Sequence, residues 1–112
     1  MKVEQFINKN QFHLYSDMIY EQENGKQIDI LQSYDSTVIK IITIDYDNSV
    51  GACTDRTITL GVNWNYSNTT SKHVYAFLEE YGNINFNGIT NKRAYINKLI
   101  NDGVIQYDAN MR

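Results

Sequence analysis

Apolar and polar residues alternate with a period of two over much of the chain before residue 65, which is typical of β-strands. Four such stretches are predicted, over residues 12–20, 26–33, 38–46 and 57–64. Asn24-Gly25 lies between the first two stretches and predicts a type I′ hairpin turn, because both residues tolerate a positive φ. Tight turns between consecutive strands predict an antiparallel meander.

The third stretch carries apolar residues on both faces. Ile42 and Ile44 share one face, whereas Ile39 and Ile41 share the other. This pattern predicts a central strand that is at least partly covered on each side. Residues 47–56, which follow it, are predicted to form a loop. A second tight turn is predicted at Tyr34-Asp35-Ser36.

Three segments instead repeat apolar residues at the spacing of an α-helix. Val3, Phe6 and Ile7 predict a short helix within the first eight residues. A second stripe follows N-cap candidates at residues 67–71 and precedes Gly82, which is expected to be left-handed; it comprises Val74, Phe77, Leu78 and Tyr81. A third stripe comprises Tyr95, Ile96, Leu99 and Ile100. Thr90 is its expected N-cap, and Gly103 is expected to end the helix in a Schellman motif that packs Val104 or Ile105 against the last turn.

The expected architecture is therefore one α+β domain over residues 1–112, a length that fits one domain. It consists of an antiparallel four-stranded meander with a short N-terminal helix and two C-terminal helices packed mainly on one face. Residues 106–112 show no periodic pattern and are expected to be frayed.

Charge and cysteine content narrow the class of protein. The 13 Asp and Glu residues outnumber the 10 Lys and Arg residues, which disfavours direct binding to nucleic-acid phosphates. No apolar run is long enough to span a membrane, and the first ten residues contain no export signal. A single cysteine, Cys53, excludes an intrachain disulfide. These features predict a cytoplasmic protein.

Metal sites are not predicted from the ligand spacing. The segment from Asp45 to Gly51 resembles a calcium loop, but its glycine is at the seventh place and Arg56 stands where a glutamate is needed. His13, Cys53 and His73 are the soft ligands, and none of them is paired at a metal-binding spacing. No cofactor is expected, although a zinc site remains open if these three residues converge with a carboxylate such as Asp45 or Asp55.

Catalytic templates also fail. Cys53 and His73 are the one nucleophile and base that could be combined, and no family signature surrounds Cys53. Glu79 and Glu80 are helix neighbours that diverge by about 100°, so they do not share a substrate. We therefore expect a protein that is not an enzyme.

Nine tyrosines and one tryptophan are the most informative residues for function. Those near strand ends, turns or helix flanks are Tyr34, Tyr46, Trp64, Tyr66, Tyr75 and Tyr107. Such rings either cap the edge of the core with their hydroxyls in water or form a surface that binds a partner. The expected partner-binding residues are Asp45, Tyr46, Asp47, Asp55, Trp64 and Tyr66. Trp64 and Tyr66 are the expected anchors.

The last helix offers an alternative. Asn91-Lys92-Arg93-Ala94-Tyr95 could begin a recognition helix for DNA. The preceding joint is long for a helix-turn-helix motif, and only Lys92, Arg93 and Lys98 are basic there.

Three segments taken together carry a resemblance, namely residues 32–37 (QSYDST), 57–67 (TITLGVNWNYS) and 69–78 (TTSKHVYAFL). The chain resembles small uncharacterised proteins that phages and plasmids of low-GC Gram-positive bacteria carry, over most of residues 27–112, and residues 47–56 look like an insertion relative to them. The resemblance implies a mobile-element origin, and small acidic proteins of that origin are often inhibitors of host defence, including anti-CRISPR proteins.

We therefore expect a non-enzymatic protein that inhibits a host defence complex in the bacterial cytoplasm by protein–protein binding. A CRISPR–Cas9 effector is the expected kind of partner, because the acidic residues could face its basic nucleic-acid channel. Two alternatives are a DNA-binding regulatory protein that uses the two C-terminal helices and a zinc-bearing structural protein.

Overall fold

The structure is a computed structural model that describes residues 2–6, 8–15, 19–21, 24–34, 36–48 and 51–112. Its elements in chain order are β1 (Lys2–Phe6), β2 (Asn8–Tyr15), β3 (Ile19–Glu21), β4 (Asn24–Ser33), β5 (Ser36–Asn48), β6 (Gly51–Gly61), α1 (Asn68–Tyr81), α2 (Lys92–Asn101) and β7 (Gln106–Asp108). No helix in these described ranges has the length and apolar character needed to cross a membrane.

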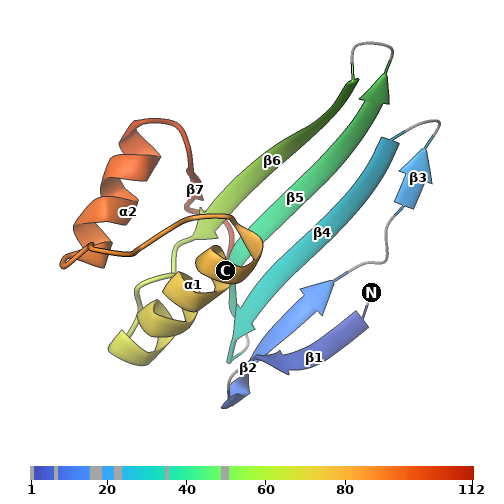
Figure 1. Ribbon diagram of the computed structural model, residues 1–112. Helices are drawn as coiled ribbons and strands as arrows, with labels where there is room; N and C mark the ends of the chain where they lie inside the picture. Colours follow the sequence, from blue (N-terminus) through green and yellow to red (C-terminus); the bar gives the residue numbers. More distant parts are fainter. Residues whose placement is uncertain (1, 7, 16–18, 22–23, 35, 49–50) are drawn as a thin grey trace.

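One seven-stranded sheet organises the molecule (Figure 1). Its main order is β1-β2-β4-β5-β6-β7, and β3 also pairs with β4. Because β5 pairs along the whole of β4, β2 and β3 must share the opposite edge of β4. Neighbouring strands are antiparallel except for β6 and β7, which are parallel, so the sheet is mixed.

The predicted four-stranded antiparallel meander with an N-terminal helix is therefore wrong. The first residues form strand β1, in which Val3 is 61% exposed while Phe6 is buried. A helix would have placed both residues on one buried stripe. The pairing of β1 with β2 shifts register between Gln5 and Phe6, and the Phe6 ring packs against Phe77 of α1 with centroids 5.3 Å apart.

The loop predicted over residues 47–56 is also wrong, because residues 47–48 belong to β5 and residues 51–56 belong to β6. The ladder continues to the pairs of Tyr46 with Cys53 and Asn48 with Gly51. Thr54 adds a bond on this hairpin by donating its hydroxyl to Asp45 Oδ1 at 2.9 Å. β-Branched residues favour the extended backbone, so threonines here extend the ladder.

The hairpin turn expected at Asn24-Gly25 is displaced. Glu21 of β3 pairs with Asn24, so the chain has already reversed before Asn24. Asn24 and Gly25 instead pair with Tyr46 and Asp45 of β5. Pairing on both sides holds these two residues in the sheet, and this tertiary contact overrides their turn preference. The second predicted turn is confirmed, because Ser33 pairs with Ser36.

The core lies between one face of the sheet and the helices. The fully buried residues on that face are Leu31, Val38, Ile39, Ile41 and Leu60, and they meet Val74, Phe77 and Leu78 of α1. The opposite face carries Ile28, Ile30, Ile42 and Ile44, all partly exposed. The helices cover the first face only, and Ile42 and Ile44 are nevertheless half-buried, as expected for a strand that is at least partly covered on each side.

Helix α1 forms where its apolar stripe predicts. Ser67 is the N-cap, and its Oγ accepts a bond from the Thr70 N–H at 3.1 Å. Gly82 is not left-handed as predicted, since its φ is −96°, and Asn83 adopts the positive φ of 56° instead. A Cβ on Gly82 would lie 2.9 Å from Leu78 O and 3.3 Å from Ile58 Cδ1. Glycine is needed here for the close approach of the helix end to the sheet.

Helix α2 begins one residue later than predicted, because Asn91 and not Thr90 caps it by accepting from the Ala94 N–H at 3.0 Å. Its predicted Schellman end is confirmed. Gly103 has φ 79° and donates its N–H to Ile100 O at 3.1 Å, while the Val104 N–H donates to Leu99 O at 2.9 Å. Ile105 is buried behind this turn.

The expected frayed tail is paired instead. β7 lies parallel to the end of β6, and the Val62 N–H donates to Met111 O at 3.0 Å. Gly61 makes this docking possible, because a Cβ there would lie 2.5 Å from Met111 O and 2.7 Å from Thr37 O.

We predict that Gly61→Ala lowers the free energy of unfolding by about 1.5 kcal/mol, because backbone on both sides leaves no room for the methyl group. Urea unfolding measures this loss. Thr57→Ala, at an exposed position of the same strand, is the control and should change stability by less than about 0.5 kcal/mol. An unchanged Gly61→Ala midpoint would contradict the docked tail.

Candidate functional site

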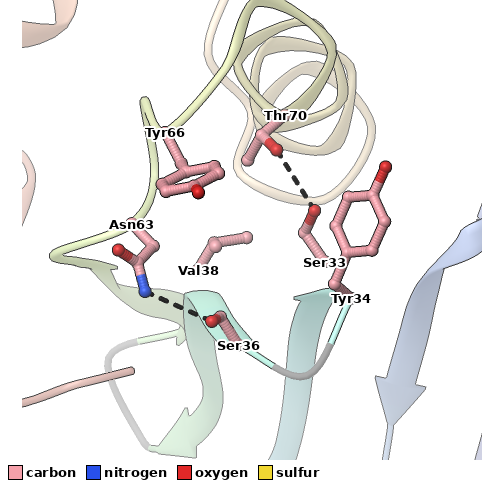
Figure 2. A pocket seen from close by; sticks show the side chains of 7 residues that line it. All are labelled: Ser33, Tyr34, Ser36, Val38, Asn63, Tyr66 and Thr70. Atoms are coloured by element: carbon pink, nitrogen blue, oxygen red, sulfur yellow. Dashed lines mark hydrogen bonds between the residues drawn. The ribbon is translucent and has the colours of Figure 1, made fainter.

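A pocket of about 500 Å³ opens where the β4–β5 turn, the β6–α1 loop and the first turn of α1 meet (Figure 2). This volume falls within the range of sites that hold small groups. Its lining comprises Ser33, Tyr34, Ser36, Val38, Asn63, Tyr66 and Thr70. We call it the turn pocket.

The sequence builds each wall of the turn pocket locally. In the β6–α1 loop, the Trp64 N–H donates to Gly61 O and the Tyr66 N–H donates to Asn63 O, both at 3.2 Å. These successive turns bring Asn63 and Tyr66 to the same side. Trp64 is only 4% exposed and anchors the loop in the core.

The polar groups of the turn pocket bond mainly to one another. Ser33 Oγ lies 3.3 Å from Thr70 Oγ1, which ties β4 to the start of α1. Asn63 Nδ2 donates to Ser36 Oγ at 3.2 Å, which ties the loop to β5. These bonds fix the walls, and Val38 supplies an apolar floor between them in Figure 2. None of the described residues that line the pocket is charged, so this part of its wall suits an apolar or neutral group.

Two exposed tyrosines flank the turn pocket, with Val38 between them in Figure 2. Tyr66 is 81% exposed and Tyr34 is 58% exposed. Tyr34 also has a φ of 55°, a left-handed conformation that costs a residue with a Cβ about 1–2 kcal/mol. A large ring in this conformation is unusual, because turns that need a positive φ favour glycine or asparagine.

We predict that Tyr34→Asn raises the free energy of unfolding by about 0.5–1 kcal/mol, because asparagine tolerates the left-handed backbone and little buried surface is lost. Thermal or urea unfolding measures the gain. Tyr107→Asn is the matched control, since Tyr107 is similarly exposed but lacks a positive φ, and it should give no gain. A loss of stability in Tyr34→Asn would contradict the assignment of strain.

The predicted partner-binding residues are not brought together. Tyr66 lines the turn pocket, whereas Trp64 is buried and cannot act as an exposed anchor. Asp45 and Asp55 are exposed toward the far end of the β5–β6 hairpin. With a rise of about 3.3 Å per residue, Asp45 is roughly 30 Å along the strand from Ser36.

Tyr46 and Asp47 belong to the same distant part of β5 by their pairing, and their side chains lie outside the described part of the structure. The six predicted residues therefore divide into an acidic hairpin end and the neighbourhood of the turn pocket.

A second polar cluster lies beneath the end of α1. His13 is buried, with Nδ1 2.8 Å from Glu4 Oε1 and Nε2 2.8 Å from Asp29 Oδ1. Its ring packs against both Phe77 and Tyr81, at centroid distances of 5.3 and 4.2 Å. Burial raises the pKa of Tyr81 above its ordinary value, and the neighbouring Glu80 carboxylate adds to this, so its phenol stays neutral.

This cluster joins three strands of the sheet, because Glu4, His13 and Asp29 come from β1, β2 and β4. Both ring nitrogens of His13 face carboxylates, and the Gln27 amide donates to Asp29 Oδ2 at 3.1 Å. We interpret the cluster as a structural link, since His13 bonds to both Glu4 and Asp29 and none of the three is among the described residues of the turn pocket.

The family of unknown function DUF8033 has a model that matches residues 1–98. The chain belongs to this family. The expectation of an uncharacterised family is thereby confirmed, and the match includes every residue of the turn pocket and of the His13 cluster. No curated protein and no solved structure matches this DUF8033 chain.

The described residues of this DUF8033 chain form no metal site. Among the described residues, no group of three or more His, Cys, Asp and Glu side chains is placed to hold a metal ion. His73, expected on the helix surface or in a cap, is buried and donates its Nδ1–H to Thr69 O at 2.7 Å. The side chain of Cys53 lies outside the described part, and its backbone pairs with Tyr46, far from the strand pairs of His13.

Sequence reasoning did not assign Tyr34 or the polar walls to the site of this DUF8033 protein. Tyr34 was recognisable as an aromatic residue in a predicted tight turn, which is a residue type that such turns disfavour. Ser33, Asn63 and Thr70 gave no such signal, because they meet only when β4, the β6–α1 loop and α1 are packed together.

Proposed function

We propose that this DUF8033 protein is a non-enzymatic binding protein that uses the turn pocket to hold an apolar side chain of a protein partner. The observation that carries the proposal is the pair of exposed tyrosines around a hollow with an apolar floor, whose described lining residues are all uncharged. Tyrosines are enriched among the residues that dominate binding energy, and they commonly surround pockets that a partner's side chain fills.

The strain at Tyr34 supports the same proposal. A folded protein keeps a backbone conformation of this kind where the surrounding structure fixes it, and such residues cluster at functional sites. The ladder pair of Ser33 and Ser36 fixes the turn on both sides, and the Ser33–Thr70 contact holds it against α1. The ring of Tyr34 is thus presented in a preset position, which reduces the entropy lost when a partner binds.

The partner that we propose is a host defence complex, and within this class a CRISPR effector such as Cas9. The support is the resemblance to proteins of phages and plasmids together with the acidic net charge of −3. Asp45 and Asp55 are exposed on opposite faces toward the hairpin end, and their negative charge suits the basic channel of such effectors. A charge of this size is too small for general mimicry of DNA, so the turn pocket must supply much of the affinity.

Purified protein should co-elute with at least one of a panel of Cas effectors, Cas9 included, and should inhibit cleavage of target DNA. The Asp45→Asn/Asp55→Asn double variant should associate more slowly, with the difference shrinking at higher salt. If the protein neither binds nor inhibits any effector of the panel, the proposal of a CRISPR partner is contradicted. If a Tyr34→Ala/Tyr66→Ala variant inhibits as well as the wild type does, the proposed role of the turn pocket in binding is contradicted.

A further inference from the structure

A second hollow lies between the two helices, and its lining residues are all different from those of the turn pocket. It has a volume of about 680 Å³. Its lining comprises Asn68, Ser71, Lys72, Tyr75, Thr90, Asn91, Lys92 and Arg93. We call it the helix hollow.

The helix hollow concentrates positive charge in an acidic protein. Lys72 comes from α1, whereas Lys92 and Arg93 are the first residues of α2. Three of the chain's 10 Lys and Arg residues therefore line one hollow, and none of its described lining residues carries a carboxylate. No described lining residue therefore neutralises these three cations.

Lys92 is held in place by aromatic rings. Its Nζ lies 5.6 Å from the centroid of the Tyr75 ring and 5.9 Å from that of Phe86. The two rings pack on each other at 5.5 Å, so they form a fixed support for the ammonium group. A cation that is already positioned loses less entropy when it binds an anion.

The helix ends add to the same field. The hollow takes in the first two turns of α1 and the N-cap and first turn of α2, and neither helix has an acidic residue in its first turn. The positive ends of both helix dipoles therefore reach the hollow without a local carboxylate to offset them. Hydroxyl groups of Ser71 and Thr90 supply further donors.

We infer that the helix hollow binds the phosphate group of a small molecule, such as a nucleotide. Phosphate carries close to two negative charges and several acceptor oxygens, which match three cations and two hydroxyls. The net charge of −3 over the whole chain disfavours an extended polyanion, so a compact ligand fits better than a nucleic-acid strand. This inference is independent of the partner-binding role proposed for the turn pocket.

A titration followed by two-dimensional amide NMR tests the inference, with inorganic phosphate, AMP, ATP and adenosine as separate probes. ATP should give saturable shifts at Ser71, Lys72, Lys92 and Arg93 at millimolar concentrations or below, AMP and phosphate should bind more weakly at the same residues, and adenosine should give none. Binding should weaken as salt is added.

The variants Lys72→Gln and Arg93→Gln should each weaken ATP binding about tenfold, because each removes one charged donor. Lys98→Gln is the matched control, since Lys98 is exposed on the same helix but does not line the hollow, and it should change the affinity less than about twofold. The inference is overturned if ATP binding does not saturate, if adenosine binds as well as ATP, or if Lys98→Gln weakens ATP binding as much as the other two variants do. It is also overturned if a single-stranded oligonucleotide binds the hollow and ATP does not.

Discussion

Replacing His13 by alanine should lower the free energy of unfolding by about 3–5 kcal/mol, because it leaves a buried carboxylate without its partner. Asp29 is buried and its Oδ1 lies 2.8 Å from His13 Nε2. The Gln27 amide remains beside Asp29 but carries no charge. The imidazole also packs against the rings of Phe77 and Tyr81, so a cavity adds to the loss. Urea unfolding of the purified variant measures the change.

Two further variants separate the charge effect from the cavity. Glu4→Gln should lower the free energy of unfolding by less than about 1 kcal/mol, because the Glu4 side chain is 51% exposed and water already screens its charge. In His13→Ala/Asp29→Ala the unpaired carboxylate is gone, so the double variant should be no less stable than His13→Ala. If His13→Ala lowers the free energy of unfolding by less than about 1 kcal/mol, Glu4, His13 and Asp29 are not a structural link.

Tyr66→Ala should reduce the affinity for the protein partner by at least about 2 kcal/mol, which is roughly a thirtyfold change in Kd. Tyr66 stands over the turn pocket with most of its surface in water, so the substitution removes contact area without disturbing the core. Its stability should change by less than about 0.5 kcal/mol, which distinguishes lost binding from unfolding.

The control for this result is Tyr107→Ala, because Tyr107 is an exposed tyrosine on β7 outside the pocket. It should leave the affinity within about twofold of wild type. If both variants weaken binding equally, the tyrosines act as a diffuse surface and the turn pocket has no special role.

The two C-terminal helices could be predicted because their apolar stripes and end residues agree. Ser67, Gly103 and the stripe residues from Val74 to Ile100 all point to the same boundaries. The edge strands could not be predicted in this way. Every residue of β7 is exposed, and the strand is held by backbone pairing with β6, which leaves no pattern of side chains.

The misassigned N-terminus has a different cause. Three apolar residues in β1 and just after it match the helix spacing, but such a short match cannot distinguish a helix from a strand with a register shift. Phe6 is buried because it meets Phe77 of α1. That contact joins residues far apart in the chain.

The candidate site was only partly within reach of the sequence for the same reason. Tyr66 could be chosen because it lies just before a predicted helix in a segment rich in asparagine and serine. Trp64 looked equally suitable, but its side chain turns into the core to anchor the loop. Alternation continues past the end of a strand only if the backbone stays extended, and two turns intervene between Gly61 and Tyr66.

Site-specific photo-crosslinking tests the central claim most directly. A photoreactive phenylalanine analogue replaces Tyr66 in one sample and Tyr107 in another, and each is irradiated in complex with the captured effector. The account predicts an efficient crosslink to the effector from position 66 and little or none from position 107. A crosslink from position 107 with none from position 66 would contradict it, because the partner would then sit on the β7 edge and leave the turn pocket open.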